Sequence, residues 1–231
     1  MHLFYVKELL PEMKSICLSE DESKHACRVL RLVKGDNVTL LDGVGGVYRA
    51  IIVEDKPKEC HLTIESYNKE QGPNFEIHIA LCPTKNMDRI EWFVEKATEL
   101  GLTELSFILT SRSERKILKL ERIEKIALSA MKQSKRAFLP KINPPISLDD
   151  FLICFPKGGI AFCEDEFKND IKSVSSSVDF PILIGPEGDF TAAEVLKAKS
   201  SGYHILTLGK TRLRTETAAL YACATLKMLF E

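Results

Sequence analysis

The sequence lacks the features that define several common classes of protein. No apolar run approaches the roughly 18 residues of a membrane-spanning helix, and no basic leader followed by an apolar stretch stands at the start. We therefore expect no membrane association, no signal peptide and a cytoplasmic protein. Hydrophobic residues make up 45% of the chain and charged residues 28%, which is ordinary for a globular protein.

Patterns typical of disulfides and metal sites are also missing. The seven cysteines are odd in number and contain no CxxC pair, and the five histidines contain no HxxxH spacing. Most of the cysteines stand in apolar, strand-like surroundings. We expect free buried thiols in a reducing compartment and no protein metal site.

The formal net charge of −1 argues against a surface that attracts nucleic acid strongly as a whole. The charges are nevertheless unevenly placed. Positions 112–141 hold ten lysines and arginines against three acidic residues, whereas positions 142–181 hold three against seven. A solvated helix face and a nucleic-acid-binding patch are about equally consistent with the basic stretch.

The first seventy residues predict a small β-rich domain. Two β-rich runs flank a glycine-rich turn in VTLLDGVGGVYRAIIVED, which is typical of a hairpin, and CHLTIESYN offers another strand. Ser19 and Glu22 have capping-box spacing, which predicts a short helix to about Leu30. The polar Gly-Pro break KEQGPN, at 69–74, separates this domain (1–70) from a second one (73–231).

Strand and helix patterns alternate in the second domain, which predicts a parallel α/β sheet. The strand-like runs are IHIALC, LSFILT, IAFC, ILI and HILTL. The clearest helix is NMDRIEWFVEKATELG, with an apolar stripe and Gly101 as its stop. Ligands of such sheets bind beyond the carboxyl ends of the strands, where the chain here carries glycine-containing loops.

The first of these loops lies in ILIGPEGDFTAAE, at 182–194. Gly185 and Gly188 permit a close approach of backbone to a ligand, and Thr191 with Glu194 predicts the cap of a following helix. Neither GxxxxGK[ST] nor GxGxxG is present, which disfavours a phosphate-binding loop and a dinucleotide-dependent oxidoreductase. A purely structural strand-to-helix turn is the alternative.

The second loop lies in LGKTRLRTETA, at 208–218. Lys210, Arg212 and Arg214 place three positive charges within five residues, and Thr215 is the predicted N-cap of a buried, alanine-rich C-terminal helix. The alternative is that Arg214 and Glu216 only solvate and cap this helix end. An exposed cap rarely needs so dense a run of cations beside a glycine.

These two loops closely resemble the paired signatures of the RsmE family, bacterial 16S rRNA N3-methyluridine methyltransferases of the SPOUT class. Three further stretches resemble the same family: NMDRIEWFVEKATELGLTELSFILTSRSERK, AMKQSKR at 130–136 and HACRVLR at 25–31. The resemblance covers essentially the whole chain in the right order. Three positions depart from the family pattern: Asp189 stands where a second glycine is usual, Thr191 where serine is more frequent, and Thr211 where arginine is frequent.

The resemblance implies a PUA-like β-barrel followed by an α/β SPOUT domain that has a parallel sheet and a C-terminal trefoil knot. It also implies a homodimer, with the C-terminal helix at the interface. S-adenosylmethionine (SAM) would bind in the knot, held largely by backbone of the two loops. The implied cofactor-binding residues are Leu183, Ile184, Gly185, Pro186, Glu187, Gly188, Leu208, Gly209, Leu213, Arg214 and Thr215.

The implied reaction is methylation of N3 of U1498 in 16S rRNA, and the net charge near zero favours the assembled small ribosomal subunit over a bare oligonucleotide as the substrate. Loss of the N3 proton calls for a base, or for a cation that stabilises charge on the ring oxygens. We assign the cation to Arg214, and the base or a positioning role to Glu216. RNA-binding candidates, chosen from local charge, are His25, Arg28, Arg31, Lys85, Arg112, Arg115, Lys135 and Arg136.

Two alternatives stay open. Another SPOUT activity, such as ribose 2′-O-methylation of tRNA, would use the same cofactor loops. A non-catalytic RNA-binding factor in ribosome assembly would belong to a different class, and failure to bind SAM would favour it.

Overall fold

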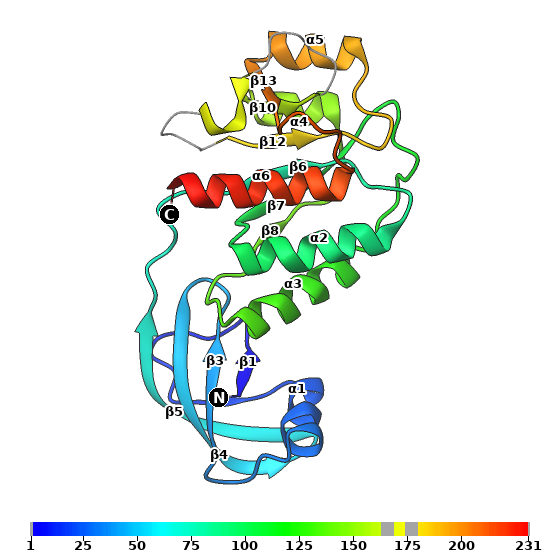
Figure 1. Ribbon diagram of the computed structural model, residues 1–231. Helices are drawn as coiled ribbons and strands as arrows, with labels where there is room; N and C mark the ends of the chain where they lie inside the picture. Colours follow the sequence, from blue (N-terminus) through cyan, green and yellow to red (C-terminus); the bar gives the residue numbers. More distant parts are fainter. Residues whose placement is uncertain (1, 163–168, 174–179, 231) are drawn as a thin grey trace. The chain divides into compact units, whose positions relative to one another are not determined.

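The computed structural model describes residues 2–162, 169–173 and 180–230, and the chain forms two compact units (Figure 1). The first unit comprises residues 1–72 and 131–139, and the second comprises residues 73–130 and 140–231. The division between Gly72 and Pro73 falls inside the polar Gly-Pro break. No helix among the described residues has both the length and the apolar character needed to cross a bilayer.

The first unit is built on a five-stranded sheet with the strand order β1-β3-β4-β5-β2. These strands span Leu3–Tyr5 (β1), Asn37–Leu41 (β3), Gly46–Lys56 (β4), Glu59–Lys69 (β5) and Ser15–Cys17 (β2). Strands β3 and β4 pair antiparallel, which confirms the predicted hairpin. Its turn needs glycine, because Gly45 has φ 99° and a Cβ there would lie 2.5 Å from the Phe138 ring.

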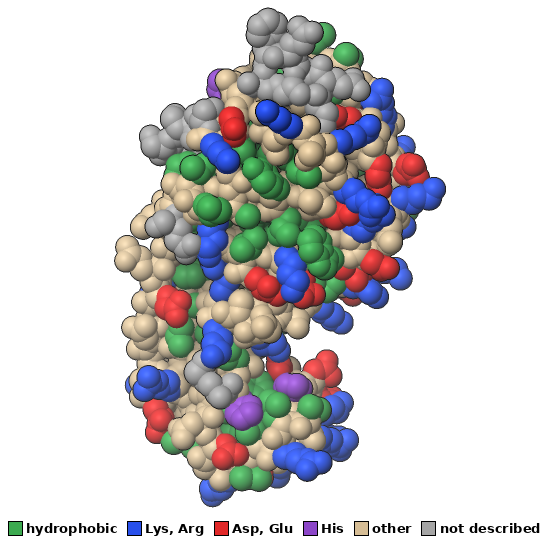
Figure 2. Space-filling view, in the orientation of Figure 1, with side chains coloured by type: hydrophobic (Ala, Val, Ile, Leu, Met, Phe, Trp, Pro, Cys, Tyr) green, Lys and Arg blue, Asp and Glu red, His purple; other side chains and the backbone are tan. Residues whose placement is uncertain are grey.

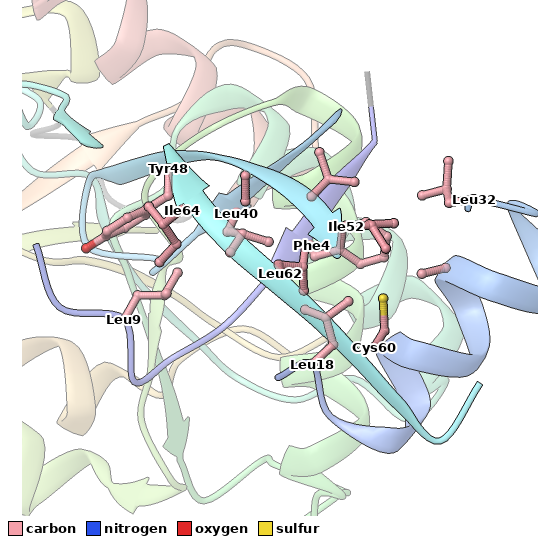
Figure 3. Packing of buried hydrophobic residues seen from close by; sticks show 13 residues of the cluster. Phe4, Leu9, Leu18, Leu32, Leu40, Tyr48, Ile52, Cys60, Leu62 and Ile64 are labelled. Atoms are coloured by element: carbon pink, nitrogen blue, oxygen red, sulfur yellow. The ribbon is translucent and has the colours of Figure 1, made fainter. Parts of the chain in front are cut away.

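Alternate residues of this sheet point into one hydrophobic core (Figure 3). Phe4, Leu40, Tyr48 and Leu62 are completely buried in it. The predicted short helix begins as α1 (Glu20–Lys24), with the Ser19 side chain accepting from the Glu22 amide at 3.3 Å. It continues as a π-helical turn, η1 (His25–Val29), which the sequence pattern did not indicate.

A distant segment completes the first unit. The end of helix α3 (Leu120–Ser134) and the residues after it, up to Leu139, belong to this unit. The Gly45 amide donates to the Ala137 carbonyl at 3.0 Å, and the Leu139 amide donates to the Gly43 carbonyl at 2.8 Å. The glycine turn of the hairpin is therefore held by backbone that lies about ninety positions further along the chain.

The second unit contains a sheet with the order β11-β13-β10-β12-β6-β7-β8, in which each neighbouring pair is parallel. Its five predicted strands are confirmed as His78–Leu81 (β6), Glu104–Leu109 (β7), Gly158–Ala161 (β10), Ile182–Ile184 (β12) and Tyr203–Thr207 (β13). The short elements Lys141–Ile142 (β8), Ile146–Ser147 (β9), Asn169–Asp170 (β11) and the 3₁₀ turn Ile171–Ser173 (η2) were not predicted.

Helices cover both faces of this sheet (Figure 1). Helices α4 (Leu148–Cys154) and α5 (Ala192–Ser200) pack with Ile160, Leu183 and Ile205 on one face. Helices α2 (Met87–Leu100) and α6 (Thr215–Phe230) pack against each other, and α6 contacts β6 and β12 on the other face.

Helix α2 follows the sequence signals closely. The Asn86 side chain caps it by accepting from the Asp88 amide at 2.9 Å, and Gly101 ends it with φ 99°. Ile90, Phe93 and Ala97 of the predicted stripe are completely buried. The local pattern therefore fixes the ends of α2 and the face that it buries.

The expectation of buried thiols is partly wrong. Cys60, Cys82 and Cys223 are buried, but Cys17 and Cys154 are exposed. Cys17 lies on the short edge strand β2 and Cys154 ends helix α4, where neither side chain faces a core. Cys163 lies outside the described residues.

Candidate functional site

A cavity of about 500 Å³ lies at the carboxyl ends of β10, β12 and β13 in the second unit. Strand β12 sits between β10 and β6, and β13 lies on the other side of β10, so the loops after β12 and β13 rise on both sides of the β10 end. The lining residues come from these three strand ends, from the loops after β12 and β13, from the start of α6 and from α2. A pocket of this size and place is typical of a small-molecule site in an α/β fold.

The loop after β12 forms one wall of the cavity. It turns at Asp189, whose φ of 59° lies in the left-handed region that glycine favours. The Asp189 amide donates to the Pro186 carbonyl at 2.9 Å, and the Asp189 carboxylate accepts from the Phe190 amide at 2.8 Å. Aspartate tolerates this conformation better than most residues, because its short side chain bonds locally, and it can therefore replace the glycine that the family pattern shows here.

The loop after β13 forms the facing wall. Gly209 has φ 113°, and its amide donates to the Thr207 hydroxyl at 3.3 Å. The Thr215 hydroxyl donates to the Gly185 carbonyl at 3.1 Å and is buried, so one hydrogen bond joins the two walls. Thr215 is the first residue of α6 and not its N-cap as predicted, and its side chain bonds the other loop instead of an amide of the helix.

Most of the residues predicted to bind the cofactor line this cavity. Those that do are Ile184, Gly185, Pro186, Glu187, Leu208, Gly209, Leu213, Arg214 and Thr215. Leu183 is not part of the lining, because its side chain is completely buried in the core under α4 and α5. Gly188 is not part of it either and lies against the Arg112 side chain.

The two predicted catalytic residues lie in different surroundings. Arg214 is exposed and lines the cavity. Glu216 is only 7% exposed and is not part of the lining. Its Oε1 lies 3.7 Å from Nε of Arg89, and its Oε2 is buried without a hydrogen-bond partner among the described residues.

Several lining residues were not predicted from the sequence. Arg89 reaches the cavity from the first turn of α2, Ala161 and Phe162 come from the end of β10, and Asp189 and Lys210 come from the two loops. The end of β10 could have been found, because it is another carboxyl strand end in the same sheet. Nothing in the local pattern around Arg89 indicates that α2 approaches the loops.

Three of the predicted RNA-binding residues gather around the loop after β12. Nη1 of Arg112 donates to the carbonyls of Gly188 at 2.6 Å and Phe190 at 3.4 Å. The Arg115 guanidinium donates to the Lys85 carbonyl at 2.9 Å. The Lys85 amide in turn donates to the Glu187 carboxylate at 3.1 Å. The two arginine side chains, the Lys85 main chain and the Glu187 carboxylate therefore hold the loops after β6, β7 and β12 together.

The capping glutamate of α5 also ties these loops. Glu194 accepts from the Thr191 amide at 2.8 Å, completing the predicted capping box, and from the Ser111 amide at 2.8 Å. Burial raises the pKa of the Glu194 carboxyl, but the hydrogen bonds from Thr191 and Ser111 together outweigh it, so this pKa is lowered. The carboxylate is thus the form that this loop junction favours.

The other predicted RNA-binding residues belong to the first unit. His25, Arg28 and Arg31 are exposed on and just after the π-helical turn, and Arg31 has φ 56°. Lys135 is exposed just past α3 with φ 58°, and Arg136 follows it. Lys132 of α3 pairs with Glu22 of α1 at 2.9 Å, which brings these two basic stretches next to each other. Non-glycine residues in this conformation are uncommon and cluster at functional sites.

Two family models match the chain. One described as an RNA methyltransferase domain matches residues 70–227, and one described as an RNA methyltransferase PUA domain matches residues 18–65.

The chain is also similar to curated proteins named Ribosomal RNA small subunit methyltransferase E. It is 30% identical to the one from Bacillus subtilis, over 94% of this chain and 91% of the relative. It is 29% identical to the one from Rickettsia conorii, over 97% of this chain and 94% of the relative.

Solved structures with the same fold cover nearly the whole chain. A probable rRNA-methyltransferase from Porphyromonas gingivalis is 37% identical with a TM-score of 0.90, over 100% of this chain and 98% of that one. The Ribosomal RNA small subunit methyltransferase E from Neisseria gonorrhoeae, solved bound to S-adenosyl methionine, is 27% identical with a TM-score of 0.87, over 100% and 98%.

Proposed function

Because this chain belongs to the RsmE family of SAM-dependent ribosomal RNA methyltransferases, we propose that it methylates N3 of a single uridine, U1498, in 16S rRNA. The proposed substrate is the assembled small ribosomal subunit. A net charge of −1 supports this choice, because such a chain has little general attraction for a bare oligonucleotide.

One observation carries the proposal. The two glycine-containing loops, which follow the strands on either side of β10, meet as facing walls of one cavity and are joined by the bond from Thr215 to the Gly185 carbonyl. Backbone at both walls offers amides and carbonyls to the edges of an adenine and a ribose, and three cations of the second loop stand at the same cavity.

The residues present fit SAM. A cavity of about 500 Å³ is within the range of small-molecule sites, and its glycines leave the backbone open to close approach. We assign cofactor binding to the backbone of Ile184–Gly188 and Leu208–Thr215, with Leu183 supporting the first wall from below. Bound SAM supplies a methyl carbon on a positively charged sulfur, and transfer breaks that bond, leaves the electron pair on sulfur, forms the bond to N3 and releases the N3 proton.

Arg214 and Glu216 are the proposed catalytic residues. Arg214 is exposed at the cavity, where its guanidinium can stabilise negative charge on the uracil oxygens as the N3 proton leaves. Glu216 stands in the first turn of α6, and it acts as the base or as a positioning group.

RNA binding is assigned to cations of both units. His25, Arg28, Arg31, Lys135 and Arg136 form the candidate surface of the first unit. Lys85, Arg112 and Arg115 are the candidates of the second, and of these Arg112 donates to the carbonyls of Gly188 and Phe190 and is assigned to that loop instead. Contacts of such side chains with phosphates give affinity but no sequence specificity. Specificity therefore requires that the target base leave its stack and be recognised in the pocket.

The remaining parts of the proposal concern assembly. A barrel-like PUA domain, a trefoil knot in the C-terminal segment, a homodimer and a cytoplasmic location are all features of the proposed enzyme. Hydrophobic side chains gather over α2 and α6 (Figure 2), where Trp92, Tyr221, Met228 and Leu229 are exposed. An exposed apolar patch of this kind supports a subunit interface on these helices.

The test incubates the purified protein and labelled SAM with small subunits that lack the modification, followed by mass spectrometry of the methylated nucleoside. N3-methyluridine at U1498 is the expected product. A methyl group on another nucleotide, or on a tRNA ribose, would keep the enzyme class and overturn the substrate. No transfer together with no binding of SAM would favour an assembly factor.

A further inference from the structure

Arg89 differs from the other cations of the cavity in origin and support. Lys210, Arg212 and Arg214 come from one exposed loop, whereas Arg89 reaches the lining from the first turn of α2. Its side chain is 35% exposed and lies against a buried carboxylate. A cation fixed by a buried partner keeps its position better than one on a loop. Electrostatic stabilisation of a reacting group requires a cation that is held in place in this way.

Arg89 pairs with Glu216, and the hydrogen bonding of this pair is incomplete. Nε of Arg89 lies 3.7 Å from Oε1, longer than a hydrogen bond, and Oε2 has no partner among the described residues. An arginine carries five N–H donors in a fixed fork and can bond both oxygens of one carboxylate. A small shift of Arg89 would therefore satisfy the buried oxygen and fix the guanidinium.

Burial limits what Glu216 can do directly. A general base must come within hydrogen-bond reach of the proton that it removes, yet Glu216 is only 7% exposed and is not part of the cavity lining. Arg89 and Thr215, its neighbours in space and in sequence, do line the cavity. Of the two roles left open for Glu216, the geometry therefore favours positioning.

We propose that Arg89 is a second substrate-contacting cation, held in place by Glu216, and that it stabilises the negative charge that develops on a ring oxygen of the target uracil. This proposal rests on the proposed function. The N3 proton passes to solvent water, and the guanidinium donates to O2 or O4 without accepting a proton. The carboxylate of SAM can accept hydrogen bonds from Arg89 in the same way, so the experiment distinguishes a contact with uracil from a contact with the cofactor.

The experiment compares Arg89→Ala, Arg89→Lys, Glu216→Gln and the double variant Arg89→Ala/Glu216→Gln with the wild-type chain. Single-turnover methyl transfer is measured at saturating SAM, across pH, on small subunits that lack the modification. Binding of S-adenosylhomocysteine and of 5′-methylthioadenosine, which lacks the amino-acid part, is measured by calorimetry. The matched control is Arg122→Ala, because Arg122 of α3 pairs at 2.7 Å with Glu91, which is on the same helix as Arg89, but does not line the cavity.

Arg89→Ala is expected to lower the transfer rate by about 100-fold or more, as loss of an oxyanion-stabilising donor does, with both binding affinities within about twofold of wild type. Its rate should depend more steeply on pH, because the uracil anion has lost a stabilising charge. Arg89→Lys should recover part of the rate. The double variant should be no slower than Arg89→Ala, because Glu216 acts through Arg89. Arg122→Ala should match the wild-type chain.

Two results would overturn the inference. Weaker binding of S-adenosylhomocysteine but not of 5′-methylthioadenosine in Arg89→Ala would place Arg89 on the cofactor carboxylate. A double variant much slower than Arg89→Ala would make Glu216 an independent catalytic group. Failure of the proposed function looks different, because the wild-type chain itself would then leave N3 of U1498 unmethylated while the two binding measurements still report on Arg89.

Discussion

Arg112 offers a sharp test of how the cofactor loop is held, because one side chain has two competing assignments. Its charge and its place after β7 predicted an RNA contact, whereas its Nη1 donates to the carbonyls of Gly188 and Phe190. The Arg112 stem also packs on Gly188, where a Cβ would lie 3.3 Å from the Arg112 Cδ. We predict that Arg112→Ala loosens the wall that binds SAM.

The magnitude follows from the bonds that are lost. A hydrogen bond from a charged donor contributes about 1.5–3 kcal/mol. Arg112 is exposed, so the lower end of this range applies, and the contact at 3.4 Å adds little. If the free loop must be ordered again on binding, about 1.5 kcal/mol corresponds to a roughly tenfold weaker affinity for S-adenosylhomocysteine.

Calorimetry of S-adenosylhomocysteine binding and the salt dependence of RNA binding together decide between the two assignments. Each phosphate contact that is lost should reduce the slope of log affinity against log salt by about 0.7–0.9. We expect Arg112→Ala to leave this slope nearly unchanged, and Arg112→Lys to weaken cofactor binding although it keeps the charge. Unchanged cofactor affinity together with a reduced salt slope in Arg112→Ala would refute the reasoning and restore the RNA contact.

Three further outcomes are expected. The pKa of Glu194 is lowered in the fold, so the stabilisation from its carboxylate is present above about pH 4.3 and is lost as the pH falls through the lowered pKa. Glu194→Gln should therefore melt at a lower temperature than wild type at pH 7 and at the same temperature in acid. Burial lowers the pKa of His78 to about 4, so the chain should lose stability between about pH 6.5 and 4, and thermal melts of His78→Gln should lack this loss. Gly209→Ala should weaken cofactor binding about fivefold or more in calorimetry, because φ 113° strains any side chain even where the space is open, and an unchanged affinity would contradict a fixed loop.

Local signals alone were enough to place much of the second unit. The caps and stripe of α2, the capping box of α5 and the five longer parallel strands follow from spacing and period within each segment. The two glycine-containing loops were identifiable for the same reason, since ligands of parallel sheets bind at carboxyl strand ends. Nine of the eleven residues predicted to bind the cofactor line the cavity.

Contacts with distant partners are not visible in the local sequence. Thr215 looks like an N-cap by its position before a helical run, but its hydroxyl is used by Gly185, thirty residues earlier in the chain. Arg112 and Arg115 look like free surface cations, but carbonyls of other loops take their donors. Residues 131–139 look like part of the second domain, and they join the first unit through the hairpin turn.

The sequence by itself determined most of the longer strands and helices and the two glycine-containing loops, because caps and periodicity are properties of neighbouring residues. Only the tertiary structure decided that Arg89 stands at the cavity with Glu216 buried behind it, and that the loops after β6, β7 and β12 are tied together. The physical reason is that a parallel sheet brings together strand ends from across the chain, and no local pattern records which side chains meet there.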